Sequence, residues 1–134
     1  MNFEDFVSGK GLRETYKAIL KLDGIEQNEK DAKQIAESAV NGGDKYAIEA
    51  LEFFYRCVGR IIQAMALMMQ PYGGIYLCGA STINNKKFIH QSRIIEESHN
   101  CLIRQQLLIQ FPVYIITKPD INIAGGSWAC RNII

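Results

Sequence analysis

Residues 45–69, KYAIEALEFFYRCVGRIIQAMALMM, decide the fold of this chain. Their polar members recur at steps of three or four, which places them on one narrow stripe of a helix; these are Lys45, Glu49, Glu52, Arg56, Arg60 and Gln63. The other positions are apolar or small, and a helix with so thin a polar face is buried on most sides. We therefore expect a central helix about 37 Å long, capped by Asp44 and packed by several neighbours.

Two short apolar runs follow this helix. GGIYLCGA at residues 73–80 is bounded by glycines, and FPVYIIT at residues 111–117 has its proline at the start. Both are typical of buried strands. The polar segment between them, residues 84–100, is predicted to be helical. Two strands joined through a helix should pair in parallel with a right-handed crossover.

Helical periodicity also marks residues 11–22, 31–40 and 123–134. The predicted order is helix, helix, long helix, strand, helix, strand, helix. The fold class is α/β, with one domain over residues 1–134 and a short parallel sheet packed on the long helix. Two strands alone make a poor sheet, so the pattern resembles one half of a larger α/β domain.

Missing strands would leave apolar side chains of the sheet uncovered. We expect this of Ile75, Leu77, Val113 and Ile115. Large exposed apolar patches are typical of association surfaces, so a homo-oligomer is predicted.

Composition excludes several classes of function. The chain has 134 residues, 48% of them hydrophobic and 22% charged, and its net charge is +1. A charge so near zero argues against nucleic-acid partners and against an anionic membrane surface. The first residues do not resemble a signal peptide, and no apolar run reaches the ~18 residues of a membrane span. A cytoplasmic protein is expected.

Other side chains receive structural interpretations. The four cysteines, Cys57, Cys78, Cys101 and Cys130, have no metal-site or disulfide spacing and are predicted to be small apolar residues in a reducing compartment. Three methionines, Met65, Met68 and Met69, are expected in the core. His90 and His99 are expected on the solvated surface, and no metal site is predicted. Asp120 is a turn residue, and Trp128 is an apolar anchor on the last helix, at an interface.

Two glycine-rich segments are candidate nucleotide sites. Glycines at the ends of a strand, here Gly73, Gly74, Gly79 and then Ala80, let a nucleotide approach the backbone N–H groups. The pattern alone favours the alternative that they only flank a buried strand. The second segment, residues 8–11 (SGKG), favours a helix cap at Ser8 over an anion site. Neither segment matches a P-loop or a dinucleotide-binding fingerprint.

Four segments together resemble the bacterial-type glucokinases of the actin-like ATPase superfamily. They are residues 7–12 (VSGKGL) with Tyr16, Ala18 and Ile19; Ala50, Leu51, Phe54, Gly59, Arg60, Ala64, Ala66 and Leu67 of the long helix; residues 72–80 (YGGIYLCGA); and residues 111–116 (FPVYII) with Gly125 and Arg131. The third segment is similar to the adenosine motif GGxxxxGG, although Ala80 stands in place of its last glycine.

The resemblance implies the C-terminal half of a glucokinase with a ribonuclease-H-like fold. Such enzymes transfer the γ-phosphate of ATP, with Mg²⁺, to the 6-hydroxyl of glucose. The resemblance implies that this half holds adenosine and supports the hinge between the two lobes. It places the nucleotide at Ser8, Gly9, Gly11, Gly73, Gly74, Gly79, Ala80 and Ser81.

The same resemblance places the catalytic base and the sugar-binding residues upstream of this chain, so no catalytic residue is expected in it. The chain alone is predicted to be inactive, and to meet glucose only together with the missing half. Two alternatives stay open: a non-catalytic oligomerising remnant, and another sugar kinase of the same superfamily.

Overall fold

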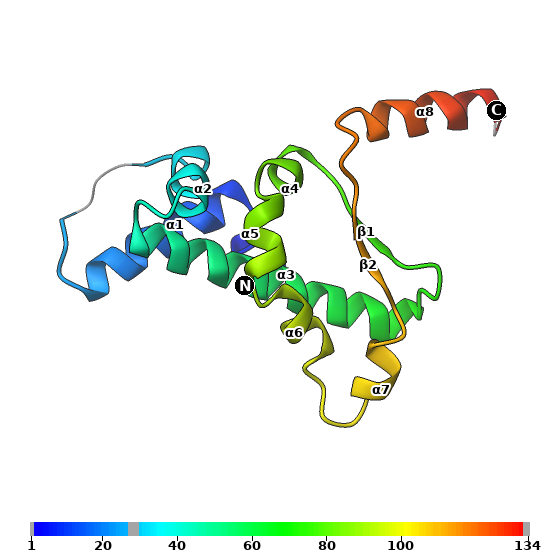
Figure 1. The fold of residues 1–134 in the computed structure, drawn as a ribbon, viewed down its shortest axis with the longest axis horizontal. Helices are drawn as coiled ribbons and strands as arrows, with labels where there is room; N and C mark the ends of the chain where they lie inside the picture. Colours follow the sequence, from blue (N-terminus) through cyan, green and yellow to red (C-terminus); the bar gives the residue numbers. More distant parts are fainter. Residues whose placement is uncertain (1, 27–29, 133–134) are drawn as a thin grey trace.

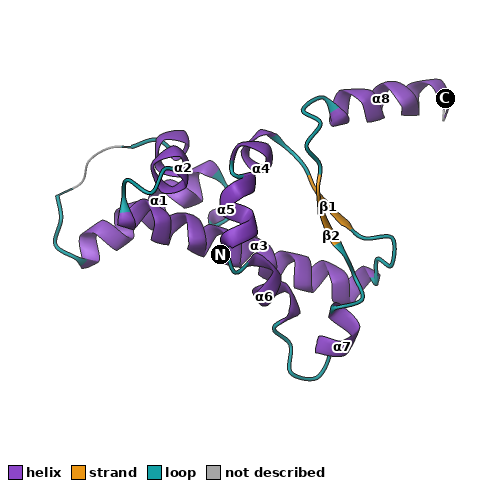
Figure 2. Ribbon diagram, viewed as in Figure 1, coloured by secondary structure: helices purple, strands orange, loops and turns teal. Residues whose placement is uncertain are grey.

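The computed structural model describes residues 2–26 and 30–132 of the chain. Helices dominate it, and the two strands are short (Figures 1 and 2). The elements in chain order are η1 (Phe3–Asp5), α1 (Gly9–Leu22), α2 (Ala32–Val40), α3 (Lys45–Met69), β1 (Ile75–Leu77), α4 (Ala80–Asn84), α5 (Lys86–Gln91), α6 (Ile94–His99), α7 (Gln105–Leu108), β2 (Val113–Ile115) and α8 (Ile121–Asn132). The predicted order is confirmed, except that residues 84–100 form several short helices where one was expected.

Side-chain caps fix where the three N-terminal helices begin. Ser8 Oγ accepts from the Gly11 amide at 3.0 Å, so α1 starts two residues earlier than predicted. Asp31 and Gln34 form a capping box at the start of α2. Asp44 Oδ1 accepts from two amides of the first turn of α3, which confirms the predicted cap.

Helix α3 is central, as its pattern predicts, and packs against α1, α2 and α6. Its buried face consists of small residues and a few large ones, namely Ala47, Ala50, Leu51, Tyr55, Gly59, Ile62 and Ala66. The expectation of burial on most sides is wrong, because the described neighbours cover one face only. The three methionines expected in the core are exposed: Met65, Met68 and Met69.

The joint between α3 and α6 combines close packing with a buried charge. A Cβ on Gly59 would lie 2.5 Å from the carbonyl oxygen of Ile94, so only glycine fits there. Glu97 is 4% exposed and meets Arg56 and Arg60 of α3 at 2.7 and 2.8 Å. Burial alone would raise the pKa of Glu97, but the hydrogen bond from Arg56 and the charge of Arg60 outweigh it and lower that pKa.

Strands β1 and β2 pair in parallel, as predicted, with Ile75 opposite Val113 and Leu77 opposite Ile115. The apolar residues expected to be uncovered are instead half-buried, because this face of the sheet packs against the helical core. The other face carries Tyr76 and Tyr114, which stack at 5.1 Å and are exposed. The prediction that both strands are buried is therefore wrong, because each exposes its tyrosine.

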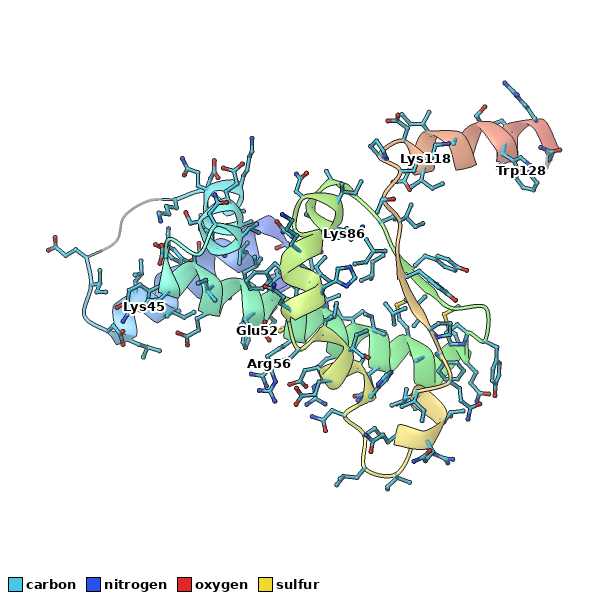
Figure 3. The ribbon with its side chains drawn as sticks, viewed as in Figure 1. Lys45, Glu52, Arg56, Lys86, Lys118 and Trp128 are labelled. Atoms are coloured by element: carbon cyan, nitrogen blue, oxygen red, sulfur yellow. The ribbon has the colours of Figure 1, made fainter. Side chains whose placement is uncertain are left out.

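Helix α8 stands away from the rest of the chain (Figure 1). None of its described residues is buried. Trp128 is 62% exposed and lies far from the helices around α3 (Figure 3). The terminal helix is confirmed over residues 123–132 and begins at Ile121, and the last two residues predicted for it lie outside the described residues. The interface predicted for Trp128 stays a prediction.

Among the described residues, no helix is both long enough and apolar enough to cross a membrane. All four cysteines are free thiols. Cys57 and Cys101 are half-buried, in line with the predicted role as small apolar residues. For Cys78 and Cys130 that prediction is wrong, because both are exposed.

Candidate functional site

A cavity of about 700 Å³ lies between the first turn of α1, one face of α2, the middle of α3 and helix α4. Its walls are made by Val7, Ser8, Gly9, Leu12, Ala32, Lys33, Ala36, Glu37, Val40, Asn41, Leu51, Phe54, Ser81, Asn84 and Asn85. The cavity therefore combines an apolar wall with polar groups from three different segments. Sites for small organic ligands commonly have this composition and volume.

The α1 side of the cavity is the start of a helix. Ser8 and Gly9 line it, and Ser8 also caps α1, which confirms the predicted cap and leaves the anion site a prediction. A Cβ on Gly9 would lie 3.4 Å from Cβ of Ala32, which places the first turn of α1 beside the first residue of α2. Free amides and the helix dipole make such a start favourable for an anionic group.

The α4 side of the cavity follows directly from strand β1. Gly79 has φ of +115°, a conformation that non-glycine residues rarely adopt, and it turns the chain from β1 into α4. Ala80 is exposed, and Ser81 is exposed and lines the cavity. The buried amide of Asn85 donates to the Tyr55 hydroxyl at 3.1 Å, which fixes this side of the cavity to α3.

Three of the eight predicted nucleotide residues, Ser8, Gly9 and Ser81, line this one cavity, and Gly79 and Ala80 form the adjoining turn. The other three lie elsewhere. Gly11 is buried against η1, where a Cβ would come within 2.5 Å of the carbonyl oxygen of Asp5.

Gly73 and Gly74 precede β1, at the end of the strand opposite the Gly79 turn. Gly74 has φ of +101°, and a Cβ there would lie 2.6 Å from the Tyr114 ring. Close packing against strand β2 is therefore sufficient to require a glycine at position 74. Neither Gly73 nor Gly74 lines the cavity.

The α2 wall is the part of the site that the sequence pattern did not indicate. It contributes Lys33, Glu37 and Asn41 together with the small residues Ala32 and Ala36. Lys33 Nζ and Glu37 Oε1 are 3.9 Å apart, and both side chains are largely exposed. One feature of the sequence could have indicated this wall: Ala32 and Ala36 are four residues apart and lie on the same face of the helix. Two small side chains there allow another segment to approach that face.

A second polar cluster lies at the start of α3. Asp44 Oδ2 accepts from the Tyr16 hydroxyl and from Lys30 Nζ, each at 2.7 Å. Burial alone would raise the pKa of Asp44, but the hydrogen bonds from Lys30, Tyr16 and the Ala47 amide outweigh it and bring that pKa to about 2. The carboxylate thus stays charged near neutral pH, and all its contacts tie α1 and the segment before α2 to α3.

The remaining titratable candidates form no second centre. His90 is exposed, as predicted. His99 is half-buried where a solvated position was expected, and burial lowers its pKa. Within residues 2–26 and 30–132, no group of three or more His, Cys, Asp or Glu side chains is arranged to hold a metal ion.

Comparison with known proteins decides the family. The glucokinase family profile matches residues 1–133. The chain belongs to the glucokinase family. It is 30% identical to the glucokinase of Rhizobium etli strain CFN 42 over 128 residues and 33% identical to that of Rhizobium johnstonii over 136 residues. Each match covers 96% of this chain and 38% of the relative, so the chain spans about two-fifths of the length of these glucokinases.

Solved glucokinase structures share the fold. The glucokinase of Balamuthia mandrillaris, solved in complex with glucose, matches with a TM-score of 0.89 and 26% identity over 98% of this chain and 37% of its own. A glucokinase from an Antarctic psychrotroph matches with a TM-score of 0.83 and 27% identity, covering 96% of this chain and 40% of its own. The helix-rich α/β fold with a short parallel sheet is thus part of the ribonuclease-H-like glucokinase fold.

Proposed function

We propose that this chain is the nucleotide-binding part of a glucokinase that transfers the γ-phosphate of ATP to the 6-hydroxyl of glucose, and that adenosine occupies the cavity between α1, α2, α3 and α4. One observation carries the proposal. The family resemblance assigns Ser8, Gly9 and Ser81 to the nucleotide, and all three line one cavity although Ser81 is more than 70 residues from the other two. They do so in a chain that belongs to the glucokinase family.

The chemistry of the cavity fits a nucleoside with phosphates. Leu12, Leu51 and Phe54 offer apolar surface to a flat base. The first turn of α1, at Ser8 and Gly9, offers backbone amides to an anion. The Gly79 turn is open, since a Cβ there would meet nothing within 4 Å, so a ligand can approach its backbone closely.

The described residues hold no metal cluster, and Mg²⁺ in this proposal arrives bound to the phosphates of ATP. Relatives are about two and a half times as long as this chain, and the additional length is where the base and the sugar site are expected. This chain alone is therefore proposed to be inactive and to contribute adenosine binding and support of the hinge. A cytoplasmic location and a homo-oligomer stay predictions.

Calorimetric titration of ADP into the purified chain tests the proposal. Ala36 lines the cavity and is half-buried, so Ala36→Leu would fill part of the space that adenosine needs. We expect the chain to bind ADP and the variant to bind at least about tenfold more weakly, because steric overlap removes most of the contacts. A coupled assay on the same sample should show no glucose phosphorylation.

The matched control is Ala18→Leu, which makes the same change on an exposed face of α1 away from the cavity. It should bind ADP as the unmodified chain does. Absence of ADP binding by the unmodified chain would contradict the proposal and favour a non-catalytic remnant. Unchanged binding by Ala36→Leu would place the nucleotide elsewhere, and phosphorylation of a sugar other than glucose by a completed enzyme would favour another sugar kinase.

A further inference from the structure

We propose that Glu37 determines the base specificity of the nucleotide site, by accepting a hydrogen bond from the 6-amino group of adenine. The inference rests on the proposed function and goes beyond it to a single residue. Glu37 lies on α2, and neither the glycine-rich segments nor the strand pattern pointed to it.

The orientation of the nucleotide follows from the charges along α2. The first residue of α2, Ala32, is beside the first turn of α1, and the only cation lining the described cavity, Lys33, comes next. The start of helix α1 and the Lys33 ammonium are both favourable for anions and lie at the same end of the cavity, so we assign the phosphates to that end. Glu37 lies one turn further along α2. Its charge would repel phosphates, so this end of the cavity is left for the base.

The length of the wall agrees with this orientation. From Ala32 to Val40 the helix rises about 12 Å, at 1.5 Å per residue. Lys33 and Glu37 themselves are about 6 Å apart along the axis. A nucleoside diphosphate laid along α2 would therefore have its phosphates at the Ala32 end, reached by Lys33, and its base at the Val40 end, reached by Glu37. The apolar side chains of Leu51 and Phe54 on α3 provide surface for the ring.

Among the side chains lining the described cavity, only Glu37 favours adenine over a 6-oxo purine, since Lys33 can only donate and is assigned to the phosphates. Amides and hydroxyls donate and accept, so Asn41, Asn84, Ser8 and Ser81 can adapt to either base. A carboxylate only accepts. Adenine presents an amino donor at its six position, whereas guanine and hypoxanthine present an oxygen that a carboxylate would repel.

The carboxylate of Glu37 is available for this contact. Among the described residues it pairs with Lys33, whose Nζ is 3.9 Å from Glu37 Oε1; the Glu37 and Lys33 side chains are 61% and 80% exposed. Exposed pairs of this kind contribute little free energy, so a ligand can replace the contact at small cost. Lys33 is then free to face the phosphates.

Calorimetric titration with ADP and with inosine diphosphate, which carries oxygen in place of the 6-amino group, tests the assignment. The unmodified chain should prefer ADP by about tenfold or more, as expected for one discriminating hydrogen bond to a charged group. In Glu37→Gln the preference should fall to within about threefold, because the amide of glutamine can donate to the oxygen as well as accept from the amine. The exposed Glu37 side chain makes this variant safe for folding.

Two further variants separate the alternatives. Lys33→Gln should weaken both nucleotides by a similar factor and leave their ratio unchanged, because it removes a phosphate contact. Glu49→Gln removes the same charge from an exposed site on α3 outside the cavity and should change neither affinity.

An unchanged ADP preference in Glu37→Gln would overturn the assignment. So would an equal loss for both nucleotides, which would mean that Glu37 contacts the ribose. If the unmodified chain binds neither nucleotide, the proposed function itself fails. If it binds ADP and inosine diphosphate equally, the proposed function stands and this inference alone fails.

Discussion

The chain has two regions that differ in how far it covers its own apolar residues. We call α1, α2, α3 and α6 the helical body, and β1, β2 and α8 the arm. The helical body contains the fully buried side chains Ile35, Leu51, Ile94 and Ser98. In the arm, every described residue is half-buried or exposed, and Ile123 and Trp128 are largely exposed.

This difference shows that secondary structure and burial have separate origins in this chain. Both regions form the elements that their sequence patterns predict, since caps, glycines and apolar periodicity act locally. Burial needs a partner in space. The helical body finds it within the chain, whereas in the arm only the inner face of the sheet does so, and no described residue of α8 is buried. We therefore expect the helical body to provide most of the free energy of unfolding, and the arm to open at low cost.

The largest effect should come from shortening the same residue in the two regions. Ile35 of α2 is 0% exposed, whereas Ile123 of α8 is 74% exposed. Ile35→Ala should lower the free energy of unfolding by about 3 kcal/mol, because it leaves a cavity in a packed core. Ile123→Ala should change it by less than about 0.5 kcal/mol. Urea denaturation followed by circular dichroism measures both.

Equal losses at the two positions would break the comparison between the regions. They would mean that α8 packs on a surface in solution, for instance one supplied by a second copy of the chain. A small loss at Ile35 alone would instead show that the core between α2 and α3 relaxes to fill the space.

The sequence predicted the helical body better than the arm for a physical reason. The polar stripe from Lys45 to Gln63 defines α3, and Asp44 caps it as expected. The same pattern could not show which apolar residues would find partners, so Met68 and Met69 were assigned to the core although they are exposed. Period-two alternation in three-residue strands was also too short to show that the tyrosines face outward.

The candidate site could be predicted only in part. Ser8, Gly9 and Ser81 came from short glycine-containing segments whose local geometry is encoded nearby in sequence. Lys33 and Glu37 come from an ordinary amphipathic helix, and only its packing beside α1 brings them to the cavity. Gly11 and Gly74 do not line the cavity, and backbone or ring atoms packed against each explain the glycine, so their assignment to the nucleotide stays a prediction.

The next largest effect should appear on acidification of the helical body. The pKa of Asp44 is about 2 in the folded chain, against an ordinary 3.8, because Lys30 and Tyr16 donate hydrogen bonds to its carboxylate. A carboxylate with a lowered folded pKa stabilises the fold above its unfolded pKa, and this stabilisation is lost as the pH falls from about 4 towards 2. A shift of this size corresponds to about 2 kcal/mol at neutral pH.

Asp44→Asn keeps a capping side chain but removes the charge, so it separates the two roles. We expect the variant to be less stable than the unmodified chain by about 2 kcal/mol at pH 7, and the difference to shrink towards pH 2. Denaturation midpoints between pH 7 and pH 2 measure this. A difference that is constant over this range would show that the ion pair with Lys30 contributes nothing and that only the cap matters.

The smallest effect is expected in the arm. Tyr76 and Tyr114 stack across the two strands at 5.1 Å, and such cross-strand pairs contribute about 0.5 kcal/mol. A double-mutant cycle of Tyr76→Ala and Tyr114→Ala, measured by hydrogen exchange of the strand amides, should find a coupling of that order. The free energy of global unfolding should stay unchanged, because a two-stranded sheet opens before the helical body does. Loss of global stability in either variant would mean that the sheet unfolds together with α3, and the division into helical body and arm would then describe packing without describing stability.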